Sequence, residues 1–193
     1  MRIITGKHRG RRIEIGPDNG KQIRPTSDFA REAIFNILNH GKLGLERHAV
    51  VEQRVLDCFC GSGALGLEAL SRGATHVTFI DKARDSIAIC RHNAAAMKED
   101  ANCAFLSADA SKLGPCGAPY SLVFVDPPYS SKLIEPTLLA LHNGKWLTED
   151  AILIIEHDEK ESVNLPEMFE QLYERRYGRA MIEVARYTPL ASA

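Results

Sequence analysis

Four consecutive residues, Asp126-Pro127-Pro128-Tyr129, could hold an amino group carried by a planar base. A proline fixes its own φ angle, has no N–H group and pushes the preceding residue toward an extended backbone, so this tetrapeptide predicts a stiff segment with accessible carbonyl oxygens. The Asp126 carboxylate and the Pro127 carbonyl would accept the two protons of an exocyclic NH2 group, and the Tyr129 ring would offer a face for stacking. The alternative is a proline-rich turn without a chemical role.

The residues before the tetrapeptide, Leu122-Val123-Phe124-Val125, are apolar and partly β-branched. Such a run is typical of a buried parallel strand. Open α/β sheets bind their ligands at the carboxyl ends of their strands. The tetrapeptide is therefore predicted to lie in an active site.

A glycine-rich segment follows an earlier apolar strand, Val55-Leu56-Asp57. It contains Gly61, Ser62 and Gly63, and leucines at helical spacing continue after it, so the segment indicates a strand, a tight loop and a helix. Glycines at positions 61 and 63 let the backbone approach a ligand closely, and the N-terminus of the helix presents free N–H groups. We expect a cofactor to bind at this loop.

Two cofactors are consistent with the loop. The Gly61-x-Gly63-x-x-Gly66 spacing and the acidic residue Asp81, about 20 positions later, match a dinucleotide fingerprint in which a carboxylate binds a ribose hydroxyl. Asp57 ends the preceding strand, where it could hold the cationic amino-acid part of S-adenosylmethionine. A hydride-transferring enzyme has no use for the segment from Asp126 to Tyr129, so the pattern favours S-adenosylmethionine over NAD.

These motifs resemble those of class I S-adenosylmethionine methyltransferases that act on amino groups of bases. Two amino-terminal segments narrow the resemblance: residues 6–12 (GKHRGRR) and 24–38 (RPTSDFAREAIFNIL). They are similar to the RsmD-type family, the bacterial methyltransferases that modify a guanine of small-subunit (16S) ribosomal RNA at N2. The resemblance extends from Met1 to about Glu156 and is weaker beyond that residue.

The resemblance implies a Rossmann-like α/β fold with a seven-stranded, mostly parallel sheet, which an antiparallel terminal hairpin would complete. The residue pattern adds an N-terminal β-hairpin arm. The resemblance also implies direct methyl transfer from S-adenosylmethionine to a guanine N2, without a metal, on RNA within an assembled or assembling 30S particle. Asp109 would contact the adenine amino group of the cofactor, although a helix cap is an alternative role for that residue. The expected cofactor-binding set is Asp57, Gly61, Ser62, Gly63, Asp81 and Asp109.

The net charge of −1 hides a basic amino terminus. Residues 1–31 carry eight Lys or Arg side chains against three acidic ones, so the rest of the chain is net negative. A basic segment on a mildly acidic enzyme is typical of a nucleic-acid-binding arm, whereas a solvated charged hairpin is the alternative. We predict an arm of residues 1–24 ahead of a methyltransferase domain of residues 25–193, with RNA bound by Lys7, Arg9, Arg11, Arg12 and Arg24.

The composition is that of one globular enzyme. The 193 residues are 45% hydrophobic and 25% charged, which is enough for one sizeable core. No apolar stretch is long enough to span a bilayer and the first residues lack a secretory signal, so we expect a cytoplasmic monomer with no membrane partner. The five cysteines have no metal-binding spacing and are predicted to be reduced core residues.

Hydrophobic spacing predicts the elements that position these residues. Strands are expected over residues 54–58, 76–80, 103–106, 121–125 and 151–155, with helices near 27–39, 65–71, 86–97 and 133–142. This alternation predicts a parallel sheet covered on both faces. Two antiparallel hairpins are expected at the ends of the chain, one from residues 2–5 and 11–15 and one from 172–177 and 180–186.

Two other functions are consistent with the same motifs. One is an amino-group methyltransferase that acts on DNA or protein and shares the segment from Asp126 to Tyr129. The other is a non-catalytic assembly factor that binds ribosomal RNA and retains only the fold. The presence of Gly61, Gly63 and Asp126 argues against this second alternative.

Overall fold

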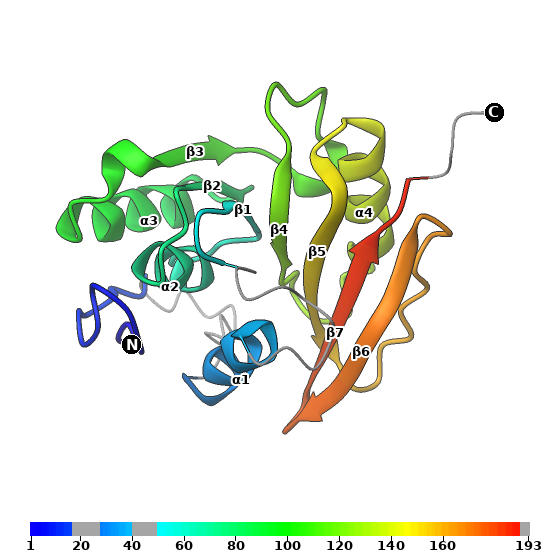
Figure 1. The fold of residues 1–193 in the computed structure, drawn as a ribbon, viewed down its shortest axis with the longest axis horizontal. Coiled ribbons are helices and arrows are strands. Elements are labelled where there is room, and N and C mark those ends of the chain that lie inside the picture. Colours follow the sequence, from blue (N-terminus) through cyan, green and yellow to red (C-terminus); the bar gives the residue numbers. More distant parts are fainter. Residues whose placement is uncertain (17–27, 40–49, 190–193) are drawn as a thin grey trace.

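The computed structural model describes residues 1–16, 28–39 and 50–189. A seven-stranded sheet runs through them in the order β3-β2-β1-β4-β5-β7-β6 (Figure 1). Strands β1 to β5 are parallel, and β7 lies antiparallel between β5 and β6. The predicted seven-stranded, mostly parallel sheet with an antiparallel terminal hairpin is therefore confirmed.

The elements follow the predicted order with small shifts at their ends. The parallel strands are β1 (Arg54–Cys58), β2 (His76–Asp81), β3 (Cys103–Ser107), β4 (Tyr120–Val125) and β5 (Leu147–Asp158), followed by β6 (Phe169–Tyr177) and β7 (Ala180–Tyr187). The helices are α1 (Asp28–Asn39), α2 (Ala64–Ser71), α3 (Arg84–Ala96) and α4 (Ile134–Asn143), with 3₁₀ turns η1 (Asp100–Asn102) and η2 (Ala110–Lys112). The longest departure is β5, which extends beyond both predicted ends.

Each face of the sheet carries its own hydrophobic core. Alternate side chains of a strand point to opposite faces, so the register partners Val55 and Leu122 lie on one face and Leu56 and Val123 lie on the other. Helices α1, α2 and α3 pack on the first face, and α4 packs on the second (Figure 1). We refer to these as the α1 face and the α4 face.

The two loops that carry the predicted chemistry start side by side. Strands β1 and β4 are neighbours at the point where the strand order reverses, and Cys58 at the end of β1 pairs with Val125 at the end of β4. The glycine loop follows the first residue and the Asp126–Tyr129 tetrapeptide follows the second. This edge is the one at which open α/β sheets bind ligands.

The amino-terminal residues do not form the predicted hairpin of two strands. In residues 1–16, a single antiparallel bridge joins Arg2 and Arg12, and the N–H of Ile3 donates to the carbonyl of Arg11. Two more backbone hydrogen bonds join the same segments, from the N–H of Gly10 to the carbonyl of Ile3 and from the N–H of Ile13 to the carbonyl of Met1, whereas the N–H of Thr5 donates to Glu68 Oε1. The two segments pair around a turn without forming regular strands, so the structure does not show the expected β-hairpin arm; we call residues 1–16 the amino-terminal loop.

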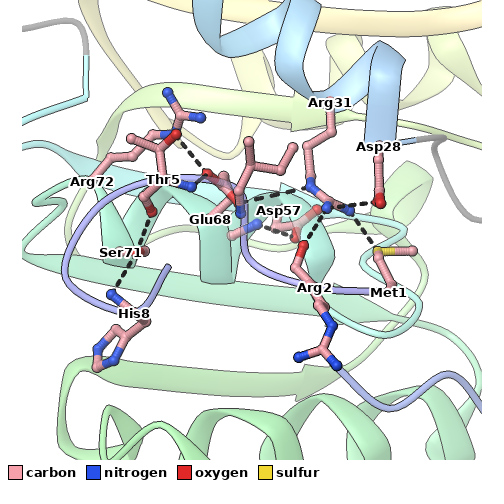
Figure 2. A network of polar contacts seen from close by, with 12 residues as sticks. Met1, Arg2, Thr5, His8, Asp28, Arg31, Asp57, Glu68, Ser71 and Arg72 are labelled. Carbon is pink, nitrogen blue, oxygen red and sulfur yellow. Dashed lines mark hydrogen bonds and ion pairs between the residues drawn. The ribbon is translucent and has the colours of Figure 1, made fainter. Parts of the chain in front are cut away.

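This loop is docked on the helices by a buried polar network (Figure 2). The carboxylate of Glu68, on α2, has no exposed surface and accepts the N–H groups of Ile4 at 2.8 Å and Thr5 at 2.9 Å. Arg31, which is equally buried on α1, lies 3.8 Å from the same carboxylate and donates to the carbonyl of Arg2. The amino-terminal loop is therefore packed against both α1 and α2.

The remaining sequence predictions concern the domain boundary, membrane spans and the cysteines. Arg24 and the expected boundary after residue 24 lie outside the described residues. Within the described ranges, none of the helices has the length and apolar character needed to cross a membrane. All five cysteines are free thiols; Cys58, Cys60 and Cys90 are buried as predicted, whereas Cys103 and Cys116 are only partly buried.

Candidate active site

Asp57, near the end of β1, is hydrogen-bonded to the first turn of the helix that follows the glycine loop. Its side chain is almost fully buried, and its Oδ2 accepts the N–H of Gly66 at 2.9 Å in α2. The pKa of Asp57 is raised from its ordinary value of 3.8 to about 7, mainly by burial; the Gly66 hydrogen bond opposes this shift, and the charges of Asp126 and Asp81 add to it. Three acidic residues predicted for the site therefore lie close enough to interact electrostatically.

Gly61 and Gly63 shape the loop in different ways. Both have positive φ angles, 52° and 80°, which glycine adopts without strain. A Cβ at Gly61 would have no atom within 4 Å, so this position faces open space beside the loop. A Cβ at Gly63 would lie 2.4 Å from Cys90 Sγ on α3, so the neighbour that excludes a side chain there is the protein itself.

Asp81, at the end of β2, is oriented by the same loop. Its Oδ2 accepts the N–H of Gly61 at 3.0 Å, and its Oδ1 accepts the N–H of Ala83 at 2.8 Å. A carboxylate oxygen has two lone pairs, so a group that accepts one hydrogen bond at each oxygen retains capacity for a further donor. The geometry suits the predicted contact with a ribose hydroxyl.

The loop between β1 and α2 has one more contact to α3 and one unusual backbone angle. The carbonyl of Ser62 accepts a hydrogen bond from the Asn93 side chain of α3 at 3.0 Å. Phe59, which the sequence did not single out, has a φ angle of 61°. A bulky residue in this conformation is strained, and such strain concentrates at functional sites. No sequence signal reveals it, because the type of the residue does not report its backbone angle.

Asp109 follows β3 and caps the turn η2. Its Oδ1 accepts the hydroxyl of Ser111 at 2.6 Å and the N–H of the same residue at 3.1 Å. These hydrogen bonds, together with the nearby charge of Lys82, hold the pKa of Asp109 below its ordinary value. The capping role considered for this residue is present, and its contact with a cofactor remains a proposal.

The tetrapeptide directly follows β4, as predicted. Asp126 is half-buried and Pro127 is buried, whereas Pro128 and Tyr129 are exposed. The Tyr129 hydroxyl donates to Oε1 of Glu156 on β5 at 3.2 Å, and Glu156 itself is only 5% exposed. Burial and then the charges of Glu156 and Asp126 raise the pKa of Tyr129 well above its usual range, so its hydroxyl remains a proton donor.

The predicted RNA-binding residues of the amino-terminal loop differ in their surroundings. Arg9, Arg11 and Arg12 are exposed. Lys7 forms an ion pair with the buried carboxylate of Glu99, with 2.6 Å between Nζ and Oε1, and half of its side chain remains exposed. Of the predicted residues, the loop thus presents three exposed arginines and one lysine that already has a partner.

Comparison with known proteins agrees with these motifs. Residues 1–186 match the family described as Conserved hypothetical protein 95. The chain is 38% identical over 159 residues to the Ribosomal RNA small subunit methyltransferase D of Escherichia coli K12, covering 82% of this chain and 75% of that protein. It is 34% identical over 176 residues to the Putative rRNA methyltransferase YlbH of Bacillus subtilis, covering 86% of each.

A solved structure supports the same relationship. The Putative methyltransferase yhhF from Escherichia coli superimposes with a TM-score of 0.79 and 32% sequence identity. The similarity covers 97% of this chain and 98% of that one.

Proposed function

The chain belongs to the RsmD-type family, matched as Conserved hypothetical protein 95, and we propose that it transfers a methyl group from S-adenosylmethionine to the exocyclic N2 of a guanine in 16S ribosomal RNA. The observation that supports this function best is the register of β1 and β4, which starts the glycine loop and the Asp126–Tyr129 tetrapeptide at neighbouring strand ends. A cofactor loop and an amino-group acceptor are thereby next to each other.

The residues of the glycine loop fit S-adenosylmethionine. The space beside Gly61 is open to a ligand, because an added Cβ would have no atom within 4 Å, and Asp81 is held in place by the N–H of that glycine. In our proposal Asp81 accepts a ribose hydroxyl, Asp109 accepts the adenine amino group, and Asp57 faces the cationic amino-acid part. The backbone of Ser62 and Gly63 completes the loop. When bound, this cofactor supplies an electrophilic sulfonium methyl group.

The tetrapeptide holds the target guanine. The Asp126 carboxylate and the Pro127 carbonyl accept hydrogen bonds from the amino group, and the Tyr129 ring stacks on the base. Fixing the amine in its reactive geometry can contribute ~7–11 kcal/mol to lowering the barrier. The lone pair of this amine is delocalised into the ring, so positive charge develops on the nitrogen during attack. Asp126 stabilises that charge and accepts the departing proton, directly or through water.

The substrate is proposed to be small-subunit RNA within an assembled or assembling 30S particle, and the enzyme is proposed to act as a cytoplasmic monomer. The exposed side chains of Arg9, Arg11 and Arg12 supply positive charge for phosphate binding on a chain whose net charge is −1. The relative from Escherichia coli K12 is named as a methyltransferase of small-subunit ribosomal RNA.

The proposed reaction is tested by methyl transfer from labelled S-adenosylmethionine to competing acceptors. Small subunits from cells that lack this protein are mixed with DNA and with ribosomal proteins, and the modified nucleosides are identified by mass spectrometry. We expect N2-methylguanosine in small-subunit RNA. Label found only in DNA or protein, or in no acceptor at all, would contradict the proposal.

A further inference from the structure

One exposed aromatic side chain, Phe29, and two half-buried ones, Tyr173 and Tyr177, gather on the α1 face at the edge strand β6. Phe29, in the first turn of α1, is 69% exposed, and its ring meets that of Tyr177 edge-on with 6.0 Å between centroids. The hydroxyls of Tyr177 and Tyr173 are 3.3 Å apart, and the guanidinium of Arg175 lies 5.6 Å from the centre of the Tyr177 ring. We call these four residues the aromatic–arginine surface. In Figure 1, α1 lies beside the end of the sheet where β6 turns into β7.

A row of register partners connects this surface with Glu156, the residue that contacts the proposed catalytic tetrapeptide. Ile182 on β7 pairs with Glu156 on β5 and with Arg175 on β6. Register partners share a face of the sheet, so the three side chains form one row across about 10 Å, two strand spacings, on the α1 face. At one end of the row Glu156 accepts the hydroxyl of Tyr129. At the other end lies the aromatic–arginine surface.

The neighbouring tip of the β6–β7 hairpin is fixed by ion pairs. Arg176 lies 2.6 Å from Glu159, and Arg179 lies 3.4 Å from Asp158 at the end of β5. The positive φ angle of Gly178, 66°, forms the turn between the two strands. These contacts hold the hairpin tip against the carboxyl end of β5, on the same edge as the tetrapeptide.

Aromatic rings beside an arginine have the chemistry that binds single-stranded nucleic acid, since bases of any type stack on the rings and the guanidinium attracts phosphate. A guanine can reach Asp126 only after it leaves the base stack. Its neighbour in the RNA then loses a stacking partner, and a protein ring nearby can replace that partner.

We propose that the aromatic–arginine surface binds the single-stranded RNA next to the target guanine, with bases stacked on Phe29 and Tyr177 and a phosphate held by Arg175. This inference rests on the function proposed above and adds a second RNA contact, separate from the amino-terminal loop. It assigns the exposed ring of Phe29 to substrate binding.

The test measures binding of the full-length protein to a single-stranded oligonucleotide of 16S sequence, by fluorescence anisotropy across a salt series and without cofactor. Loss of one stacking ring is worth ~1–3 kcal/mol. Phe29→Ala is therefore expected to weaken binding about fivefold to 150-fold without changing the salt slope, whereas Phe29→Tyr keeps the ring and binds like wild type. Arg175→Ala is expected to weaken binding and to lower the slope by about 0.7.

Two variants serve as matched controls. Leu139→Ala removes another exposed apolar side chain, which lies on α4. Arg91→Ala removes another arginine that lies over an aromatic ring; its guanidinium is 4.5 Å from the centre of the Phe105 ring on β3, which pairs with β2. Neither variant is expected to alter RNA binding. Because Phe29 is largely exposed, its replacement leaves the core intact, which thermal unfolding monitors.

The outcomes separate the inference from the function on which it rests. The inference is overturned if the wild type does not bind the oligonucleotide, or if Phe29→Ala and Arg175→Ala bind it as tightly as wild type. Binding to assembled small subunits is measured in parallel, and the inference is also overturned if these variants lose affinity for the subunits but not for the oligonucleotide, since a ribosomal protein would then be the favoured partner. A wild type that binds RNA but methylates no subunit would instead overturn the proposed function.

Discussion

The hydroxyl of Tyr129 donates a hydrogen bond to Oε1 of Glu156 across 3.2 Å, which links the loop after β4 to the end of the neighbouring strand β5. Glu156 is nearly buried and therefore is a well-fixed acceptor. The bond orients an otherwise exposed ring at the edge where the glycine loop also begins. A ring held in this way suits the stacking role that we propose for Tyr129.

Replacement of Tyr129 separates the contribution of its ring from that of its hydroxyl. Tyr129→Ala is expected to lower kcat/KM on small subunits about fivefold to 150-fold, because a stacked base contributes ~1–3 kcal/mol. Tyr129→Phe keeps the ring and is expected to have a much smaller effect. Tyr187→Phe is the control, since it removes a hydroxyl that lies 2.8 Å from His142 Nδ1 away from the site. Equal kinetics of Tyr129→Ala and wild type would contradict the stacking role.

Cofactor binding is predicted to depend on the space at Gly61. Gly61→Ala places a methyl group in this space and is expected to weaken binding of S-adenosylhomocysteine by about tenfold or more in calorimetry, a loss of ~1.4 kcal/mol. Gly178→Ala is the matched control, because this glycine also has a positive φ and no atom within 4 Å of an added Cβ, but lies in the β6–β7 turn. If both variants bind the cofactor as tightly as wild type, the glycine loop is not the cofactor site.

The raised pKa of Asp57 predicts a pH dependence of stability. Its pKa in the folded protein, about 7, is above its ordinary value of 3.8, so the folded state binds the proton more tightly than the unfolded state does. This contribution to stability is fully present below pH 4 and is lost as the pH rises through 7. Urea unfolding between pH 4 and 8 should show that Asp57→Asn loses less stability than wild type over this range. Parallel curves for the two proteins would refute this role of Asp57.

The amino-terminal arginines are predicted to set the salt dependence of RNA binding. Each phosphate contact contributes about 0.7 to 0.9 to the slope of log affinity against log salt. Alanine at Arg9, Arg11 and Arg12 should therefore weaken binding and flatten the slope, while cofactor affinity stays unchanged. The control variant replaces Lys98 and Lys145, which are also exposed. A slope and a methylation rate that match wild type would mean that the loop is only a solvated surface.

The order of the strands and helices could be predicted because the apolar runs that form them are short and clearly separated. The strand predicted over residues 121–125 became β4 with one added residue, and the segment 54–58 became β1 without change. The positions of the two loops followed from these strands. The open α/β topology then brought Asp57, Asp81 and Asp126 within electrostatic reach of one another.

The contacts that the sequence could not predict join residues far apart in the chain. The docking of the amino-terminal loop could not be predicted, because Ile4 and Thr5 donate to Glu68, a helix residue more than sixty positions away. No role for Glu156 could be assigned from its position at the end of a strand, because its contact with the Tyr129 hydroxyl depends on the pairing of β5 with β4. Both contacts depend on tertiary packing and leave no local pattern.

The most direct test of the account compares methyl transfer to small subunits by wild type and by Asp126→Ala, with affinity for S-adenosylhomocysteine measured in parallel. We predict that wild type forms N2-methylguanosine in 16S RNA and that Asp126→Ala retains the cofactor but reacts about 10²-fold or more slowly, because it lacks the acceptor for the developing charge. Equal rates for the two proteins, with equal cofactor affinity, would contradict the central role of the Asp126 carboxylate.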